Sequence, residues 1–408
     1  MVRLNRHTPR EAINKINTNK DKRVANGITQ FDHWSRILPA LAVSGLGAMF
    51  YNILPLFIGA AQDAFSLSSF QAGTIATAFF AGWNLATILA FFWIQRVNWR
   101  IATIVWLAIT FFGLLSGLFA TSYAKLLVTV LISGMGFAAL YGLGTRILAD
   151  TSDPSRWYGI KVGVEVIPGA TLLVVLPSTL LLSMGMSGVI WGMIGMSLVI
   201  SFALFTMPAD GRAPTGESSV DKESTSKTAF ESLKWPVWMA LACTCIYFAA
   251  ASAIWSFLER MGASGGLTTI EIGNILALTL VFATSGSFLT GWLGSRFGNV
   301  NPFLISILAL IASLLLLAGF ETPRQYAIAA CIFSFMFGVG VPFAVAEVAK
   351  RDPDGRYVIL SVPAIGFGAM IGPALGGLLI TGTEFIMLCG TVATIMLVTG
   401  LVIRLGRS

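Results

Sequence analysis

Long apolar runs are the feature of this sequence that most restricts its fold. A membrane-spanning helix needs roughly 20 consecutive, mostly apolar residues. Runs of this kind cover 37–62, 70–94, 101–121, 126–149, 158–182, 189–206, 235–258, 270–293, 303–320, 326–348, 358–381 and 385–403. Charged residues make up only 11% of the chain, whereas a soluble domain carries about 25%. The sequence therefore predicts an all-α integral membrane protein with twelve transmembrane helices.

A transmembrane β-barrel does not fit these runs. Barrel strands alternate apolar and polar residues over about ten positions, and these runs are longer and continuously apolar. Helices satisfy every backbone N–H within their own segment, which a lipid environment requires.

The positions of the basic residues predict the orientation in the membrane. With a cytoplasmic N-terminus and alternating spans, all 26 Lys and Arg residues except Lys125, Arg260 and Arg324 lie on the cytoplasmic side or at adjacent span ends. Lys and Arg concentrate in cytoplasmic segments of membrane proteins. We therefore expect a multi-pass protein of the cell (inner) membrane with both termini cytoplasmic, and we interpret the net charge of +7 as a topology signal, not as a nucleic-acid site.

Polar segments divide the chain into two halves. We expect a basic cytoplasmic tail over 1–35, six helices within 36–208, a cytoplasmic linker over 209–234, six helices within 235–404 and a short tail over 405–408. The first 35 residues are too long and polar to begin a signal peptide.

Several chemistries lack the residues they need. The chain has no Gly-Lys pair and therefore no P-loop, and its two histidines, His7 and His33, precede the first span. The four cysteines lie inside apolar runs, where cysteine usually packs as a small hydrophobe. We expect no enzymatic activity, no cofactor, no metal and no disulfide, and a monomer that works in the lipid bilayer.

Internal repeats indicate that the halves are related. The stretch TGWLGSRFGNVN (290–301) carries Arg296, and AFFWIQRVNWRI (90–101) carries Arg96. A second pair is YGLGTRILADTSDPSRWYG (141–159) and FGVGVPFAVAEVAKRDPDGRYV (337–358). Each member of this pair has an aromatic-Gly-x-Gly, then an acid, then a proline turn and an arginine. The sequence thus predicts two pseudo-symmetric six-helix halves.

These motifs resemble those of the major facilitator superfamily. GWLGSRFGN is similar to the signature G-x-x-x-D-R-x-G-R that follows the second and eighth spans in that family, with Ser295 in place of the aspartate; Gln95 stands there in the first half. The resemblance covers about 36–404. It implies a central solute cavity and alternating access, in which the two halves rock about the membrane midplane.

The resemblance also implies a cytoplasmic gate. Its predicted latches join Arg96 to Asp150 and Arg296 to Glu347, with Arg156 and Arg356 as further members. Such arginines can bond helix C-terminal carbonyls and carboxylates. The alternative is that these charges only anchor loops at the membrane surface.

Ionisable residues inside a bilayer are costly and are functional candidates by default. Glu165 lies nine residues after Arg156, roughly 13 Å along a helix, and is our candidate proton-coupling residue. One interpretation pairs Arg146 with Glu165 across adjacent helices, so that protonation of the acid is coupled to an anion on the arginine. The other has local pairs, Arg146 with Asp150 and Glu165 with Lys161.

Polar and aromatic residues near mid-membrane form the candidate solute site. They are Tyr51, Asn52, Trp83, Asn84, Arg146, Tyr247 and Trp255. A buried amide in hydrocarbon requires partners, whereas aromatic residues in spans more often face lipid or pack in the core. Pro55 predicts an unwound or bent helix that frees backbone groups near Asn52.

We expect a secondary active transporter that takes up a small organic acid with protons, the solute having an aromatic or otherwise apolar body. The competing transport function is proton-coupled efflux of hydrophobic compounds. Drug exporters of the family commonly carry an arginine before GMGFAA in the fourth span, and here Val130, Leu131 and Ile132 occupy that stretch. A non-transporting receptor on the same fold and a passive channel are the hypotheses of other classes.

Overall fold

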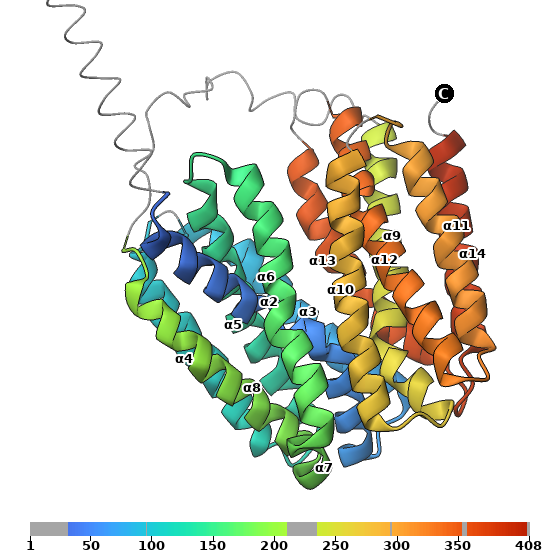
Figure 1. The fold of residues 1–408 in the computed structure, drawn as a ribbon, viewed down its shortest axis with the longest axis horizontal. Coiled ribbons are helices and arrows are strands. Elements are labelled where there is room, and N and C mark those ends of the chain that lie inside the picture. The colour runs from blue at the N-terminus through green and yellow to red at the C-terminus, as the bar shows by residue number, and fades with distance from the viewer. Residues whose placement is uncertain (1–31, 95, 210–234, 294–295, 353–356, 406–408) are drawn as a thin grey trace, which may run out of the picture.

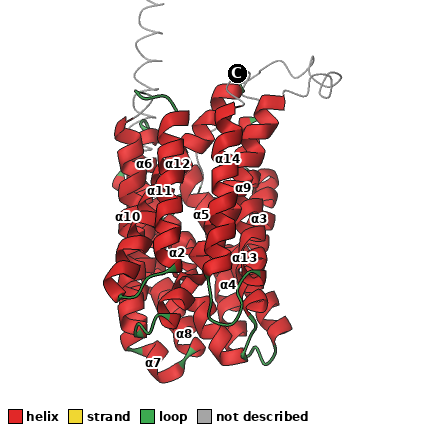
Figure 2. Cartoon of the chain, turned by 90° about the vertical axis from the view of Figure 1, so that its right-hand side faces the viewer, coloured by secondary structure: helices red, strands yellow, loops and turns green. Residues whose placement is uncertain are grey.

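The structure, a computed structural model, describes residues 32–94, 96–209, 235–293, 296–352 and 357–405. Its described residues are almost entirely helical (Figure 2). Twelve of the helices are long and apolar enough to cross a membrane. The predicted fold class is therefore confirmed.

The spans follow the predicted runs closely. The first six are α2 (Trp34–Phe65), α3 (Ser69–Trp93), α4 (Trp99–Leu118), α5 (Tyr123–Ala149), α6 (Pro154–Val175) and α8 (Met186–Ser201), with the short α7 (Leu180–Met184) between the last two. The second six are α9 (Trp235–Ser264), α10 (Thr269–Leu293), α11 (Val300–Ala318), α12 (Pro323–Arg351), α13 (Ser361–Leu378) and α14 (Ile386–Leu405).

Several helices begin a few residues before the apolar run because polar caps extend them. Asp153 accepts a hydrogen bond from the Arg156 backbone N–H and precedes Pro154 at the first helical position. Ser122 and Thr322 cap α5 and α12 in the same way. Such caps satisfy N–H groups that have no partner within the helix.

Each half contains the same kind of close helix contact, formed by two glycines. A Cβ at Gly82 in α3 would lie 2.0 Å from the Leu131 carbonyl oxygen of α5, and one at Gly134 would lie 2.3 Å from that of Phe79. The same reciprocal pair recurs between α10 and α12. A Cβ at Gly286 would lie 2.1 Å from the Phe335 carbonyl oxygen, and one at Gly338 would lie 2.0 Å from that of Ala283. Glycine permits this approach because it has no side chain. The recurrence supports the predicted pseudo-symmetry.

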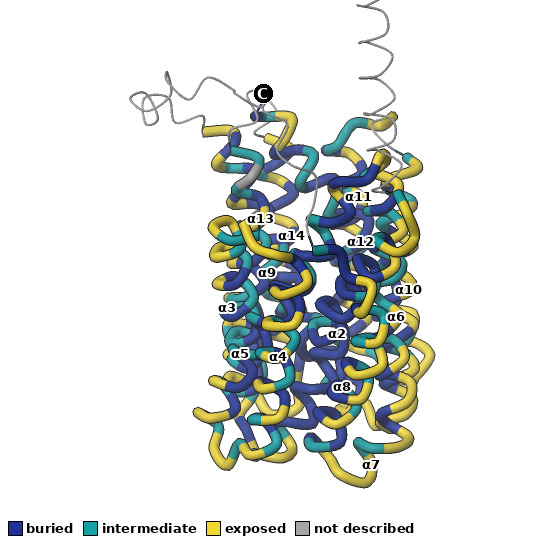
Figure 3. The backbone as a smooth tube through the Cα atoms, turned by 90° about the vertical axis from the view of Figure 1, so that its left-hand side faces the viewer, coloured by how far each residue is buried: buried dark blue, intermediate teal, exposed yellow. Residues whose placement is uncertain are grey.

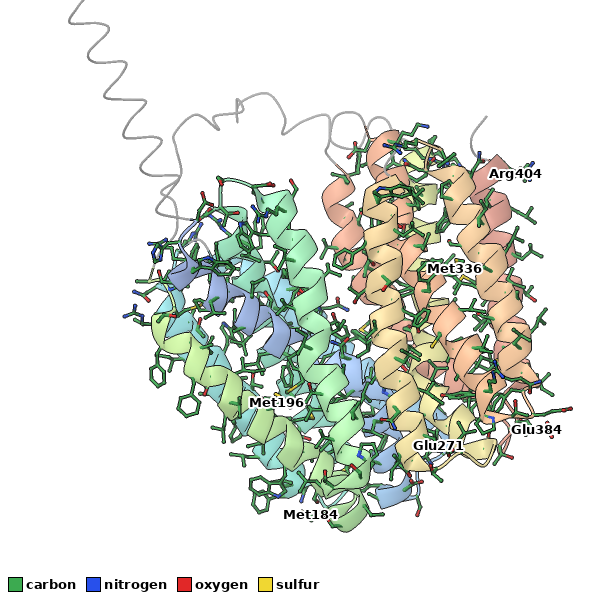
Figure 4. The ribbon with its side chains drawn as sticks, viewed as in Figure 1. Met184, Met196, Glu271, Met336, Glu384 and Arg404 are labelled. Atoms are coloured by element: carbon green, nitrogen blue, oxygen red, sulfur yellow. The ribbon has the colours of Figure 1, made fainter. Side chains whose placement is uncertain are left out.

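The halves meet most closely at one end of the bundle. Figure 1 shows their ribbons approaching one another at the end opposite the C-terminus and diverging toward the end that carries it. Arg404 marks the C-terminal end, and Met184, Glu271 and Glu384 mark the opposite one, here called the distal end (Figure 4).

Small residues and one ion pair join the halves near the distal end. A Cβ at Gly73 of α3 would lie 2.2 Å from the carbonyl oxygen of Pro373 in α13, and one at Gly273 of α10 would lie 2.3 Å from that of Leu173 in α6. Arg260 of α9 donates two hydrogen bonds to Asp63 of α2, at 2.7 and 3.0 Å. Arg260 is one of the few basic residues that the charge pattern places outside the cytoplasmic side, and here it bridges the halves.

The innermost helix is α2. In its most apolar 18-residue stretch 89% of the residues are buried, compared with 33–61% in the corresponding stretches of the other spans. Figure 3 shows its tube mostly in the buried colour, surrounded by helices whose outer turns are exposed. Side chains of α2 therefore reach the interior of the protein, where they contact several other helices.

The glycine contacts give a prediction about stability. Gly286→Ala should lower the free energy of unfolding by about 1–3 kcal/mol, because the new Cβ overlaps the α12 backbone. Gly195→Ala in α8 is the matched control, since a Cβ there meets nothing within 4 Å. Thermal unfolding of the purified protein in detergent measures both. Equal midpoints for the two variants would contradict the proposed close contact.

Candidate functional site

An ion pair is buried near the middle of the membrane. Lys161 and Glu165, one helical turn apart on α6, form a salt bridge and are each only 4% exposed. Glu165 lies near the middle of the 25-residue span Pro154–Ser178. Burying two charges is costly unless each finds a partner. This pair is therefore the main polar feature at the centre of the first half.

Tyr141 of α5 contacts both charges. Its ring lies beneath the Lys161 ammonium, with Nζ 3.6 Å from the ring centroid. Its hydroxyl faces the Glu165 carboxylate. A cation over an aromatic face is stabilised by the ring quadrupole, more strongly where water is excluded. Tyr141 thus holds the ion pair from the neighbouring helix.

Aromatic rings from three helices continue from this point. Trp83 of α3 packs against Tyr141 with 5.3 Å between ring centroids and against Tyr51 of α2 with 5.8 Å. All three residues are half-buried. We refer to Tyr51, Trp83 and Tyr141 as the aromatic wall. Its residues come from three different spans, so the fold brings two of the predicted solute residues together beside Glu165.

Pro55 explains how the second half reaches this wall. A proline inside a helix has no N–H for the carbonyl four residues earlier, which here belongs to Tyr51. That carbonyl accepts a hydrogen bond from the Trp255 indole N–H of α9, at 3.1 Å. The helix itself stays continuous through Pro55, so of the two predicted forms, unwound or bent, the unwound one does not occur. Pro342 acts similarly in the other half, where the freed Gly338 carbonyl accepts from Ser287 at 3.2 Å.

The two candidate amides are both buried. Asn52 is 2% exposed and donates from Nδ2 to the Glu165 backbone carbonyl at 2.9 Å. Asn84 is 9% exposed, and a Cβ on Gly366 of α13 would lie 1.8 Å from its Oδ1. Asn84 Nδ2 is buried without a hydrogen-bond partner among the described residues. Asn52 therefore supports α6, and Asn84 touches the opposite half with an unused donor.

Tyr247 lies apart from this group. It is fully buried in the second half, stacked on Phe337 of α12 at 5.7 Å and packed on Phe303 of α11. Its surroundings are those of a core residue, and its role in binding solute stays a prediction.

The acids of the predicted gate pair locally. Asp150 pairs with Arg146 at 2.5 Å, and Glu347 pairs with Arg351 at 2.9 Å. Because Arg146 contacts Asp150 and Glu165 contacts Lys161, the local alternative is the one formed here, and the pairing of Arg146 with Glu165 is not. Arg351, one turn after Glu347, was missed as a gate candidate.

The predicted gate arginines are exposed where they are described. Arg96 and Arg296 are exposed, and Arg296 lies over Trp292 at 5.9 Å. Arg156 is also exposed and lies over Trp157 at 5.6 Å. Arg356 lies outside the described residues. Their action as latches stays a prediction for another conformation.

A cavity lies between the halves near the distal end. It has a volume of about 260 Å³ and is lined by Gln62, Ser69, Phe257, Arg260, Ala263, Ser264, Gly382, Thr383 and Phe385. It is adjacent to the Asp63–Arg260 bridge. No cluster of His, Cys, Asp and Glu suited to a metal occurs in the part of the chain that the structure describes.

The fold is that of a helical membrane protein, and the sequence places it in a family. The model of the Major Facilitator Superfamily matches residues 40–356, so the chain belongs to that superfamily and is a non-enzymatic, multi-pass membrane transporter.

Two curated relatives are transporters. The gentisate transporter of Corynebacterium glutamicum is 27% identical over 422 residues, covering 92% of this chain and 90% of that protein. The glucose facilitated diffusion protein of Zymomonas mobilis is 32% identical over 116 residues, 24% of each chain.

Solved structures share the fold. The nucleoside transporter NupG matches with a TM-score of 0.68 and 16% identity, over 91% of this chain and 99% of that one. A bacterial homologue of the human lysosomal transporter Spinster matches with a TM-score of 0.64 and 17% identity, over 91% and 94%.

The bond from Trp255 to Tyr51 gives a second prediction. Trp255→Phe keeps an aromatic ring but leaves the Tyr51 carbonyl without its donor, which should lower the free energy of unfolding by about 1–3 kcal/mol. Trp191→Phe on the exposed side of α8 is the control. Thermal unfolding in detergent compares the two, and an unchanged Trp255→Phe midpoint would show that the bond contributes no stability.

Proposed function

We propose that the protein is a secondary active transporter that takes up a small aromatic acid together with protons. The observation that carries the proposal is the buried Lys161–Glu165 pair beside the aromatic wall. Glu165 can gain and lose a proton, Lys161 offers a cation for an acid, and the wall offers faces for an aromatic ring. In this proposal Lys161 replaces Arg146 as the cation of the site.

The contacts between the halves support alternating access. The wall belongs to the first half, whereas Trp255 and Gly366 of the second half touch Tyr51 and Asn84 at the same depth. A solute bound here would contact both halves. Rocking of the halves would then expose it to one side and later to the other.

The gentisate transporter supports the choice of solute class. It aligns over 90% of its length with this chain, and gentisate is an aromatic carboxylate. We propose that this chain carries an acid of that class from outside the cell to the cytoplasm. In this proposal the protein lies in the inner membrane, and both termini and most of the basic residues are on its cytoplasmic side.

Proton coupling is tested at Glu165. Glu165→Gln should abolish the accumulation of labelled gentisate in membrane vesicles under an imposed pH gradient, because an amide cannot exchange a proton. Glu384→Gln, at an exposed position at the distal end, is the matched control and should accumulate the acid normally. Undiminished accumulation by Glu165→Gln would exclude that residue as the proton carrier.

Counterflow in proteoliposomes distinguishes the competing functions. A carrier exchanges external labelled acid for internal unlabelled acid, so the label should enter transiently above its equilibrium level. A channel only equilibrates the label, and a receptor moves none. Counterflow of hydrophobic cations in place of acids would instead support efflux of hydrophobic compounds.

A further inference from the structure

We propose that the carboxylate of the solute and the carboxylate of Glu165 occupy the same site on Lys161 in turn, so that the solute binds after Glu165 has taken up a proton. This inference rests on the proposed function, because it requires an acidic solute. It adds the order of binding and the charge balance of the transport cycle, and it makes Lys161 the residue that selects for acids.

The order of binding follows from the need to keep the buried site electrically neutral. With Glu165 ionised, the Lys161–Glu165 pair is neutral and both side chains are enclosed. A solute anion added to this neutral site would leave one unbalanced negative charge inside the membrane, which is strongly disfavoured. Once Glu165 is protonated, the site carries the positive charge of Lys161 alone. An anion then restores neutrality.

The groups around Glu165 leave Lys161 as its counter-charge. On its own helix Glu165 faces Lys161, from α5 it faces Tyr141, and from α2 it faces Tyr51. The other helices that pack on α6 add no charge at this depth: α8 has no charged residue, and in α10 the charged residue is Glu271 in its first turn. Where α10 approaches this part of α6, Phe288 lies 3.5 Å from a Cβ built on Gly163.

The incoming carboxylate would find the same donors that Glu165 uses now. Lys161 donates to Glu165, and the Tyr141 hydroxyl faces the same carboxylate. After protonation both donors become available to another carboxylate. The ring of the solute would then lie toward Trp83, which packs on Tyr141. Tyr141 acts here as a positioning residue, because its ring holds the Lys161 ammonium where the solute carboxylate would bind.

The charge balance of the cycle follows. One proton from the outer solution forms the Glu165 carboxylic acid, and one monovalent anion binds Lys161. Both are released inside, and the Lys161–Glu165 pair forms again. Each cycle moves no net charge, so uptake should respond to a pH gradient and not to membrane potential.

Binding by the full-length protein in detergent tests the order. Labelled gentisate is titrated at about pH 5.5 and about pH 8. Both values lie above the ordinary pKa of a carboxylic acid, so the gentisate itself remains ionised throughout. Wild-type affinity should rise several-fold at the lower pH. Glu165→Gln should bind with the higher affinity at both pH values, because its side chain is permanently neutral.

Three further variants separate binding from folding. Lys161→Gln should lose gentisate binding at both pH values. The double variant Lys161→Gln with Glu165→Gln removes both charges without leaving one unpaired, and it should also fail to bind while unfolding at a temperature close to that of the wild type. Tyr141→Phe keeps the ring under Lys161 and removes the hydroxyl, so it should bind more weakly and still bind better at the lower pH.

The outcomes distinguish the two proposals. If the wild type binds no aromatic acid at either pH, the proposed function fails and this inference fails with it. If the wild type binds the acid but Glu165→Gln binds no more tightly than the wild type at the higher pH, the shared site on Lys161 is wrong and acid transport stands. Uptake driven by membrane potential alone would also overturn the inference.

Discussion

The lipid environment requires that every backbone polar group and every charge find its partner inside the protein. The twelve helices meet most of this requirement within their own backbones. The remaining needs arise where prolines or charges interrupt the pattern, and the structure meets them with specific side chains. Trp255 bonds the carbonyl freed by Pro55, Ser287 bonds the one freed by Pro342, and Lys161 is paired with Glu165. These are also the positions that give the interior its chemistry.

Much of the fold could be predicted from the sequence, because a spanning helix in a membrane protein can be recognised without an amphipathic pattern. Length and continuous apolarity identify spanning helices regardless of which face is buried. The predicted runs therefore agree with the helices, and the differences lie at the ends, where caps such as Asp153 extend them. The pairing of α3 with α5 and of α10 with α12 through reciprocal glycine contacts was not predicted and required coordinates to establish.

The site was less predictable because it depends on which side chains meet across helices. Glu165 was identified from the cost of burying a charge, and Lys161 was known only as a possible local partner. Tyr141 was part of a quoted repeat, yet nothing in the sequence indicates that its ring lies under Lys161. Tyr247, chosen by the same reasoning as Tyr51, lies instead in the core of the second half. Aromatic residues in spans look alike in sequence whether they pack or bind.

The bond between Trp255 and the Tyr51 carbonyl has a consequence for motion. When the halves separate at this depth, that carbonyl loses its indole donor, and the proline that freed it prevents the helix from supplying another. A water molecule replaces such a donor at little enthalpic cost. Any separation of the halves at this depth therefore requires hydration of this one point on α2.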